Sequence, residues 1–188
     1  MKPVLIMLMI ITTANAITAD DVYTDHGPDR YKQLNGSTVV TNVTVCTNET
    51  EIEDVNNILD EYVLTRTRES RVFDCSNIAE IDWYILERAG KDCDIAANGG
   101  KLNGKDMGHV FVWVKTETGI IVVDSTYGAT SQYGIGGTIE PGEFYTNAWV
   151  YDSPKDVVES YRDERPGMTG ITLDTPIEEL PIRRKAAC

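Results

Sequence analysis

The sequence predicts an α+β fold, in which two helices are followed by antiparallel strands. Apolar residues recur at helical spacing in residues 50–63 and again in residues 74–89. In residues 109–124 they instead alternate or form β-branched runs, which is typical of strands. Helices that precede strands, instead of alternating with them, indicate the α+β class. The 188 residues are 41% hydrophobic, which suffices for one domain with its own core.

The first predicted helix starts at Thr50. Thr50 and Glu53 have the spacing of a capping box, in which each side chain accepts a hydrogen bond from the other residue's backbone N–H. Before this helix, residues 17–49 form a polar leader segment with one short β-prone run at residues 38–45. The apolar face of the helix is expected to consist of Ile52, Val55, Leu59, Tyr62 and Val63.

The second predicted helix begins near Asp74 and ends before Gly90. Asp74 is a suitable N-cap, and Gly90 stands where a helix commonly ends in a left-handed residue. Residues 91–108, which are rich in Gly, Asn and Asp, are predicted to be a linker. The helix should bury a broad apolar stripe made of Ile78, Ala79, Ile81, Ile85, Leu86 and Ala89.

Two strands follow, at residues 109–115 and 120–124. A hairpin loop at residues 116–119 joins them, and it pairs residue 115 with residue 120. Both strands are rich in valine and isoleucine, which favour sheets. The sequence therefore predicts an antiparallel pair in the centre of the fold.

The remaining elements are shorter. Residues 127–142 are glycine-rich and predicted to be a loop, residues 144–151 a further strand, and Ser153-Pro154 the start of a short helix. Prolines then interrupt any periodicity, so residues 166–188 are expected to form a C-terminal tail. The predicted folded domain is residues 50–165.

Residues 1–16 are predicted to be a signal peptide. Lys2 supplies the positive end, residues 4–11 an apolar centre, and Ala14-Asn15-Ala16 a small-x-small cleavage site. We expect a secreted or cell-surface protein with no stable membrane insertion after cleavage, since no later segment is apolar enough to span a bilayer. The alternative is an uncleaved N-terminal anchor.

Net charge narrows the class of partner. The formal charge is −13 at pH 7, with 30 acidic and 17 basic residues. Binding to nucleic acid depends on clustered Lys and Arg that neutralise phosphates. We therefore expect no nucleic-acid partner.

Export also changes the reading of the cysteines and asparagines. Four cysteines in an exported chain can form two disulfides, with three possible pairings. If Cys75 is free, a Cys46–Cys93 bond is the first choice, and Cys188 is left unpaired. Three glycosylation sequons begin at Asn35, Asn42 and Asn48.

Cys75 is a candidate nucleophile because of its predicted place at a helix N-terminus. A cysteine attacks as the thiolate, and the unpaired N–H groups and positive dipole end of a helix favour that anion. The same N–H groups can stabilise the oxyanion of an acyl transfer. The carboxylate of neighbouring Asp74 opposes this effect.

The chain contains two histidines that could act as the base, His26 and His109. His26 lies in the polar leader beside a Gly-Pro pair, where a solvated loop residue is expected. His109 opens a predicted strand, and the hairpin register makes Asp124 its diagonal neighbour on the same face, roughly 7–8 Å away at the backbone. A carboxylate and an imidazole can bridge that gap and fix the ring tautomer, as a triad requires.

Three stretches together resemble the transglutaminase-like superfamily. They are DCSNIA at residues 74–79, GHVFVWV at residues 108–114 and VVDSTYG at residues 122–128. They are similar to the family's nucleophile helix, its histidine strand and its aspartate strand, in that order. The resemblance covers roughly residues 50–151. Departures are Phe73-Asp74, where the family often has small residues, and Ser125, where it usually has proline.

The resemblance implies a papain-like core, with the nucleophile helix packed on an antiparallel sheet. It implies that Cys75 attacks, His109 transfers the proton and Asp124 orients His109. The expected activity is that of a cysteine peptidase or amidase acting through a thioester on a peptide, protein or cell-wall substrate. Transamidation by the same triad is an alternative, as is a catalytically inert extracellular binding module.

Other functional assignments stay open or are excluded. No CxxC or HExxH pattern is present, so no metal site and no cofactor are expected. Trp113 and Trp149 are candidates for the substrate groove, although the core is the commoner place for tryptophan. The residue that completes the oxyanion hole is not assigned, with Gln33 and Tyr62 as guesses.

Overall fold

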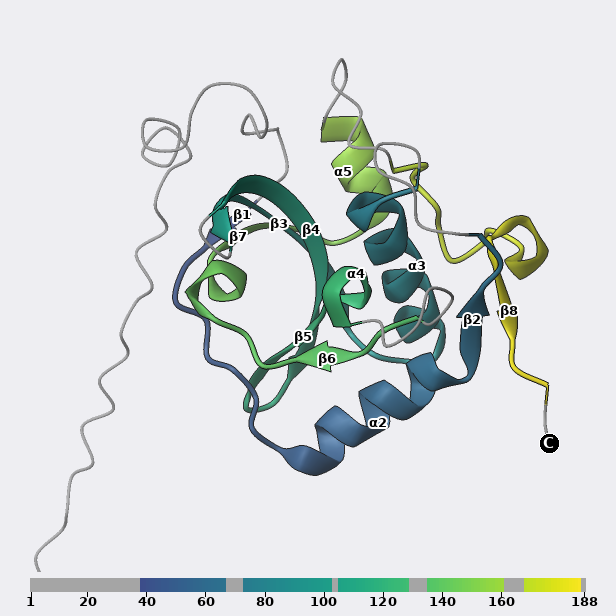
Figure 1. The fold of residues 1–188 in the computed structure, drawn as a ribbon, viewed down its shortest axis with the longest axis horizontal. Helices are drawn as coiled ribbons and strands as arrows, with labels where there is room; N and C mark the ends of the chain where they lie inside the picture. Colours follow the sequence, from purple (N-terminus) through teal and green to yellow (C-terminus); the bar gives the residue numbers. More distant parts are fainter. Residues whose placement is uncertain (1–37, 67–72, 103–104, 129–134, 161–167, 187–188) are drawn as a thin grey trace, which may run out of the picture.

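The computed structural model describes residues 38–66, 73–102, 105–128, 135–160 and 168–186. Within them the chain forms helices packed on an antiparallel sheet (Figure 1), so the predicted α+β class is confirmed. No helix in this part of the chain is long and apolar enough to cross a bilayer. The predicted signal peptide, residues 1–16, lies outside the described residues, as do His26, Gln33 and Asn35.

Six strands form the main sheet. Their order is β1-β7-β3-β4-β5-β6, and every neighbouring pair is antiparallel. Figure 1 shows that the sheet is strongly curved and that its long strands β3 and β4 bend into an arch. The strands are β1 Thr38–Val40, β3 Cys93–Leu102, β4 Lys105–Thr116, β5 Gly119–Val123, β6 Thr138–Ile139 and β7 Ala148–Tyr151.

Helices α2 and α3 pack on one side of this sheet, and a two-stranded ribbon completes the fold. Helix α3 lies against β3 and β4, and α2 crosses beside α3 (Figure 1). The helical elements are α2 Glu49–Asp60, α3 Cys75–Arg88, α4 Ser125–Gly128, α5 Pro154–Ser160 and the 3₁₀ turns η1 Glu143–Thr146 and η2 Ile177–Glu179. The ribbon pairs β2 Tyr62–Leu64 with β8 Ile182–Arg184.

Helix α3 begins and ends where the sequence predicts. The Asp74 side chain accepts from the N–H of Ser76, and the Asn77 side chain accepts from the N–H of Asp74, which makes a reciprocal capping box. Gly90 follows the last turn with φ +84°, a conformation that glycine adopts without the strain of a Cβ. The caps therefore fix the position of Cys75 as the first residue of the helix.

The bounds predicted for the first helix were wrong at both ends. Helix α2 begins at Glu49, because the side chain of Asn48 accepts from the N–H of Thr50 and acts as the N-cap. The helix ends at Asp60, and Tyr62 and Val63 continue into β2 instead of extending the apolar stripe. The partner for β2 comes from the far end of the chain, which a local pattern does not reveal.

Most of the described part of the linker predicted at residues 91–108 is instead strand, namely β3 and the start of β4. β3 pairs with β4 over ten residues, and it also pairs with β7 on its other side. Asn98, Gly99 and Gly100 have low strand propensity. Residues 98–100 pair with β4, and residues 95–97 just before them pair with both β4 and β7, which supplies the backbone hydrogen bonds that overcome this propensity.

The predicted register of the β4–β5 hairpin is confirmed, with Lys115 opposite Ile120. The loop is tighter than predicted, because Thr116 already pairs with Gly119. Gly119 has φ +152°, and a Cβ built there would lie 2.4 Å from the carbonyl oxygen of Thr44. The segment before α2 therefore passes so close to this turn that only glycine fits.

The region after residue 142 is more ordered than predicted. The strand predicted at residues 144–151 divides into η1 and the shorter β7. Helix α5 starts at Pro154 as predicted. The tail predicted at residues 166–188 rejoins the fold through β8 and through Glu80 of α3, whose carboxylate accepts from the N–H groups of Thr169 and Ile171.

Both faces of the sheet are buried. Alternate residues of β3, β4 and β5 pack with α2 and α3, among them Ile95, Val110, Val112, Ile121 and Val123. The opposite face forms a second, more aromatic cluster made of Ala96, Phe111, Trp113, Ile120, Val122, Tyr145, Ala148 and Val150. Since residues alternate along β4, His109 lies on the same face as this aromatic cluster.

Candidate active site

Cys75 is the first residue of α3 and is partly exposed, with a free thiol. The side chain of Asp74 caps the helix by accepting from the N–H of Ser76. This hydrogen bond holds the Asp74 carboxylate next to the backbone of the first turn of α3. The sulfur thus lies at the positive end of a 14-residue helix, the position that favours a thiolate.

His109 is buried on β4 among aromatic rings. Its ring centroid lies 5.9 Å from that of Phe111, 6.4 Å from that of Phe144 and 6.2 Å from that of Tyr145, which approaches edge-on. Nε2 of His109 lies 2.6 Å from Oδ2 of Asp124. The rings therefore exclude water from one side of the imidazole and leave the carboxylate as its polar partner at Nε2.

Asp124 directly follows β5 and is buried. Three donors converge on its carboxylate: Nε2 of His109 and the hydroxyl of Tyr145 at Oδ2, and the N–H of Thr126 at Oδ1. The last two distances are 2.8 and 3.1 Å. An ionised carboxylate can accept all three bonds, because it has about four lone-pair positions and no proton of its own.

The side chains of Cys75 and His109 are hydrogen-bonded to each other. Nε2 is turned to Asp124, so Nδ1 is the second ring nitrogen of His109 that can take part in hydrogen bonding. Burial by itself lowers the pKa of His109, but the hydrogen bonds to Asp124 and Cys75 and their charges outweigh it and raise that pKa to about 9. At neutral pH the site therefore contains an imidazolium between a carboxylate and a sulfur.

A second carboxyl group lies behind Asp124 and was not predicted from the sequence. Asp82 of α3 is 1% exposed and faces Asp124 and Ser125. Its pKa is raised to about 8, mainly by burial and in addition by the charge of Asp124, while interaction with Ser125 acts in the opposite direction. Asp82 is therefore protonated at neutral pH. In the sequence Asp82 is an acidic residue between Ile81 and Trp83, and only the structure shows that residues 76–86 of this helix are all buried.

The two tryptophans do not line an open groove. Trp113 is 2% exposed, and its indole N–H donates to the carbonyl oxygen of Tyr145 at 2.9 Å. Trp149 is 8% exposed and packs in the core on β7. Tyr62, a guess for the oxyanion hole, lies on β2, where its hydroxyl accepts from Nε of Arg184.

The disulfide predicted between Cys46 and Cys93 is not formed in the structure, where both are buried free thiols. Cys93 begins β3, whereas the N–H of Cys46 donates to Ile120 of β5, with β4 between the two strands. Neighbouring strands lie about 4.8 Å apart, so the two backbones are roughly 10 Å or more apart. A disulfide requires Cα atoms within about 7 Å. The Cys46 thiol instead donates to Glu51 at 3.1 Å.

Two of the three predicted glycosylation sites lie in the described part of the chain, and both are exposed. They are Asn42, next to the edge strand β1, and Asn48, whose side-chain oxygen caps α2. Attachment of a glycan uses the side-chain nitrogen, so it is compatible with the Asn48 cap.

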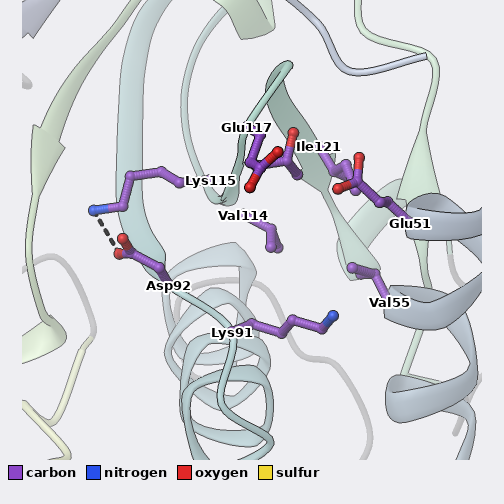
Figure 2. Close-up of a pocket in the computed structure, with 9 residues that line it drawn as sticks. Glu51, Val55, Lys91, Asp92, Val114, Lys115, Glu117 and Ile121 are labelled. Carbon is purple, nitrogen blue, oxygen red and sulfur yellow. Dashed lines mark ion pairs between the residues drawn. The ribbon is translucent and has the colours of Figure 1, made fainter. Parts of the chain in front are cut away.

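No metal site is found in the described ranges, where no three His, Cys, Asp or Glu side chains come together in a way that would hold an ion. A pocket of about 400 Å³ lies at the other end of α3, between α2 and the β4–β5 hairpin. Figure 2 shows its charged walls, with Glu51, Lys91 and Glu117 around the opening and Lys115 paired to Asp92. Helix α3 has 14 residues, so its length of about 21 Å separates the pocket from Cys75.

Comparisons with protein-family models, with curated proteins and with solved structures found no match to this chain. The site is therefore characterised by its own geometry: a thiol at a helix N-terminus, an imidazole hydrogen-bonded to it, and a buried carboxylate on the far side of the ring. This is the order of groups needed for a cysteine nucleophile, its general base and an orienting acid.

Proposed function

We propose that this protein is an exported, transglutaminase-like cysteine hydrolase that cleaves a peptide or carboxamide bond. One observation carries the proposal: Cys75, His109 and Asp124, which come from α3, β4 and the end of β5, form one hydrogen-bonded chain. Burial and aromatic packing hold the last two in place. A papain-like core is the fold that accounts for this delivery of the three groups.

The proposed reaction begins with the thiolate of Cys75 and the imidazolium of His109. The sulfur attacks the carbonyl carbon of the substrate, and the carbonyl oxygen takes up the negative charge. The capping bonds of Asp74 occupy later amides of the helix, which leaves the N–H of Cys75 itself as a donor for this oxyanion.

Collapse of the tetrahedral intermediate breaks the carbon–nitrogen bond. The imidazolium of His109 gives its proton to the leaving amine or ammonia, and a thioester on Cys75 remains. Neutral His109 then takes a proton from water as the water attacks the thioester. The second collapse releases the carboxylic acid and restores the thiolate–imidazolium pair. Asp124 keeps the ring oriented through both steps.

The test is capture of the thioester, followed by identification of its acceptor. The mature protein is incubated with unfolded proteins, glutamine amides and cell-wall peptides, and acylation is detected by intact mass and peptide mapping. We expect the acyl group on Cys75 and release of a new amine or ammonia. Transfer to an added amine, in preference to water, would reassign the enzyme as a transamidase.

Substitutions define the role of each group. Cys75→Ala should abolish acylation and turnover, and His109→Ala should cost nearly as much, since members of such a unit act together. Asp124→Asn should reduce turnover by about 10²- to 10⁴-fold. Cys46→Ser is the matched control, because it removes another free thiol that lies beside α2 and β5, outside the site. Two outcomes would favour an inert binding module. In the first, a thiol reagent labels Cys75→Ala as much as the wild type. In the second, none of the substrate classes acylates the wild type.

A further inference from the structure

A tyrosine hydroxyl shares the oxygen of Asp124 that faces the histidine. The hydroxyl of Tyr145 donates to Oδ2 at 2.8 Å, and Nε2 of His109 lies 2.6 Å from the same atom. Tyr145 is 7% exposed, and its ring stands edge-on to that of Phe111, with the centroids 4.9 Å apart. A buried hydroxyl with a charged acceptor makes a strong hydrogen bond that water does not replace.

The 3₁₀ turn η1, which contains Tyr145, is hydrogen-bonded to side chains of the sheet and to the residue that follows the turn. Three side-chain amides or indoles donate to three consecutive carbonyl oxygens of η1. Asn98 of β3 donates to Phe144 at 2.6 Å, and Trp113 of β4 donates to Tyr145 at 2.9 Å. Asn147 donates to Glu143 at 2.7 Å. These bonds fix the backbone of a four-residue turn whose one buried residue is Tyr145.

The shared oxygen has an electrostatic consequence for the imidazole. A donor to an anion stabilises its charge and reduces the field that the anion exerts on its other partner. The titratable groups that face this pair are Asp82 and Cys75 from α3 and Tyr145 from η1. Of these, the Tyr145 hydroxyl is the group that contacts Oδ2 directly alongside His109.

We propose that Tyr145 is a positioning residue of the Cys75–His109–Asp124 site: its hydroxyl holds the Asp124 carboxylate in line with His109 and limits the negative charge that the imidazole meets. The role of Tyr145 in catalysis rests on the proposed function, but the effect of its hydroxyl on the protonation of His109 does not. The effect is a property of the folded, substrate-free protein. It sets the pH at which the imidazolium gives up its proton.

The experiment is an NMR titration of the histidine ring. The chain has two histidines, so the imidazole signals are few and are assigned by a His26→Ala variant. In the wild-type protein we expect the pKa of His109 to be about 9. In Tyr145→Phe we expect the pKa of His109 to rise by about one pH unit. The Asp124 carboxylate then has one hydrogen-bond donor fewer, so it attracts the imidazolium more strongly. In Asp124→Asn we expect the pKa of His109 to fall.

Tyr84→Phe is the matched control. It removes another tyrosine hydroxyl on a different face of the molecule, one that donates to the carbonyl of Thr175 at 2.6 Å. The His109 titration should not change in this variant. A Tyr145→Phe variant whose His109 titrates at the wild-type pH, or lower, would overturn the proposal, since loss of packing alone does not strengthen the Asp124–His109 interaction.

A second variant covers the case in which Tyr145→Phe does not fold. Asn98→Ala keeps the hydroxyl but releases the carbonyl of Phe144 from β3. It should raise the pKa of His109 in the same direction by a smaller amount, and an unchanged or lowered value would count against the proposal. No substrate is needed for either titration. Failure of this inference is therefore separate from failure of the proposed hydrolase, which is judged by acylation of Cys75.

Discussion

Replacing Asp82 with asparagine tests whether an uncharged carboxyl group lies behind the site. Burial, and then the charge of Asp124, raise the pKa of Asp82 from 3.8 to about 8, against hydrogen bonds from Ser125. Between these two values the folded protein keeps the proton and the unfolded chain does not. The unfolded state then binds fewer protons, so the free energy of unfolding falls as the pH rises through this window. The contribution is complete below about pH 4 and lost by about pH 8.

The size of the effect follows from the width of the window. Each pH unit changes the free energy of unfolding by about 1.4 kcal/mol for one proton, so the loss across the window is on the order of 5 kcal/mol. Asp82→Asn keeps the shape of a protonated carboxyl group but does not ionise. The stability of the variant relative to the wild type should therefore rise with pH, from little or no gain near pH 4 to a gain of several kcal/mol near pH 8.

The assay is urea unfolding, followed by tryptophan fluorescence in a reducing buffer between pH 4 and pH 9. His109 also makes the wild type less stable at alkaline pH, because its raised pKa gives a contribution that is complete below 6.5 and lost as the pH passes about 9. That loss occurs in both proteins, so the difference between them is read below pH 8, before most of the loss from His109 sets in. Asp60→Asn, at an exposed carboxylate that pairs with Lys185, is the matched surface control. A difference between Asp82→Asn and the wild type that stays constant with pH would refute a buried neutral carboxyl.

Two further predictions concern the backbone and export. Gly119→Ala should destabilise the fold by about 1–3 kcal/mol or more in the same unfolding assay, because φ is +152° and the added Cβ meets the carbonyl of Thr44. Gly90→Ala is the control and should cost only about 1 kcal/mol, since φ is +84° and nothing lies within 4 Å of the added Cβ. Equal costs for the two variants would contradict this account. N-terminal sequencing of exported protein should begin at Ile17, whereas a chain that still begins at Met1 would make residues 1–16 an anchor.

The parts of the fold that the sequence predicts are those set by local signals. The Asp74 cap and Gly90 define α3, and short-range pairing defines the β4–β5 hairpin. Local spacing places Cys75 at the start of α3 and His109 near Asp124, whereas the approach of Cys75 to His109 was expected from the family resemblance. The His109–Asp124 pair was predicted as a diagonal pair, and the structure has it as a direct hydrogen bond.

The parts that the sequence does not predict depend on distant partners. β3 has the composition of a loop, and its strand conformation comes from β4 on one side and β7 on the other. β2 looks like a helix end until β8 pairs with it from more than a hundred residues away. The contact between Tyr145 and Asp124 is not predicted from the sequence, because it forms only when η1 folds back onto Asp124. The expected Cys46–Cys93 bond failed for the same reason, since strand order determines which cysteines meet.

The two buried acids, Asp124 and Asp82, differ in their hydrogen-bond donors. Asp124 accepts hydrogen bonds from His109, Tyr145 and Thr126. Asp82 is fully enclosed, and its interaction with Ser125 offsets only part of the effect of burial, so it keeps its proton at neutral pH. If Asp82 were also ionised, two adjacent negative charges would repel each other and bind His109 as a cation more tightly. The neutral Asp82 and the hydroxyl of Tyr145 thus act in the same direction, because both limit the negative charge near His109, which has to release its proton in each catalytic cycle.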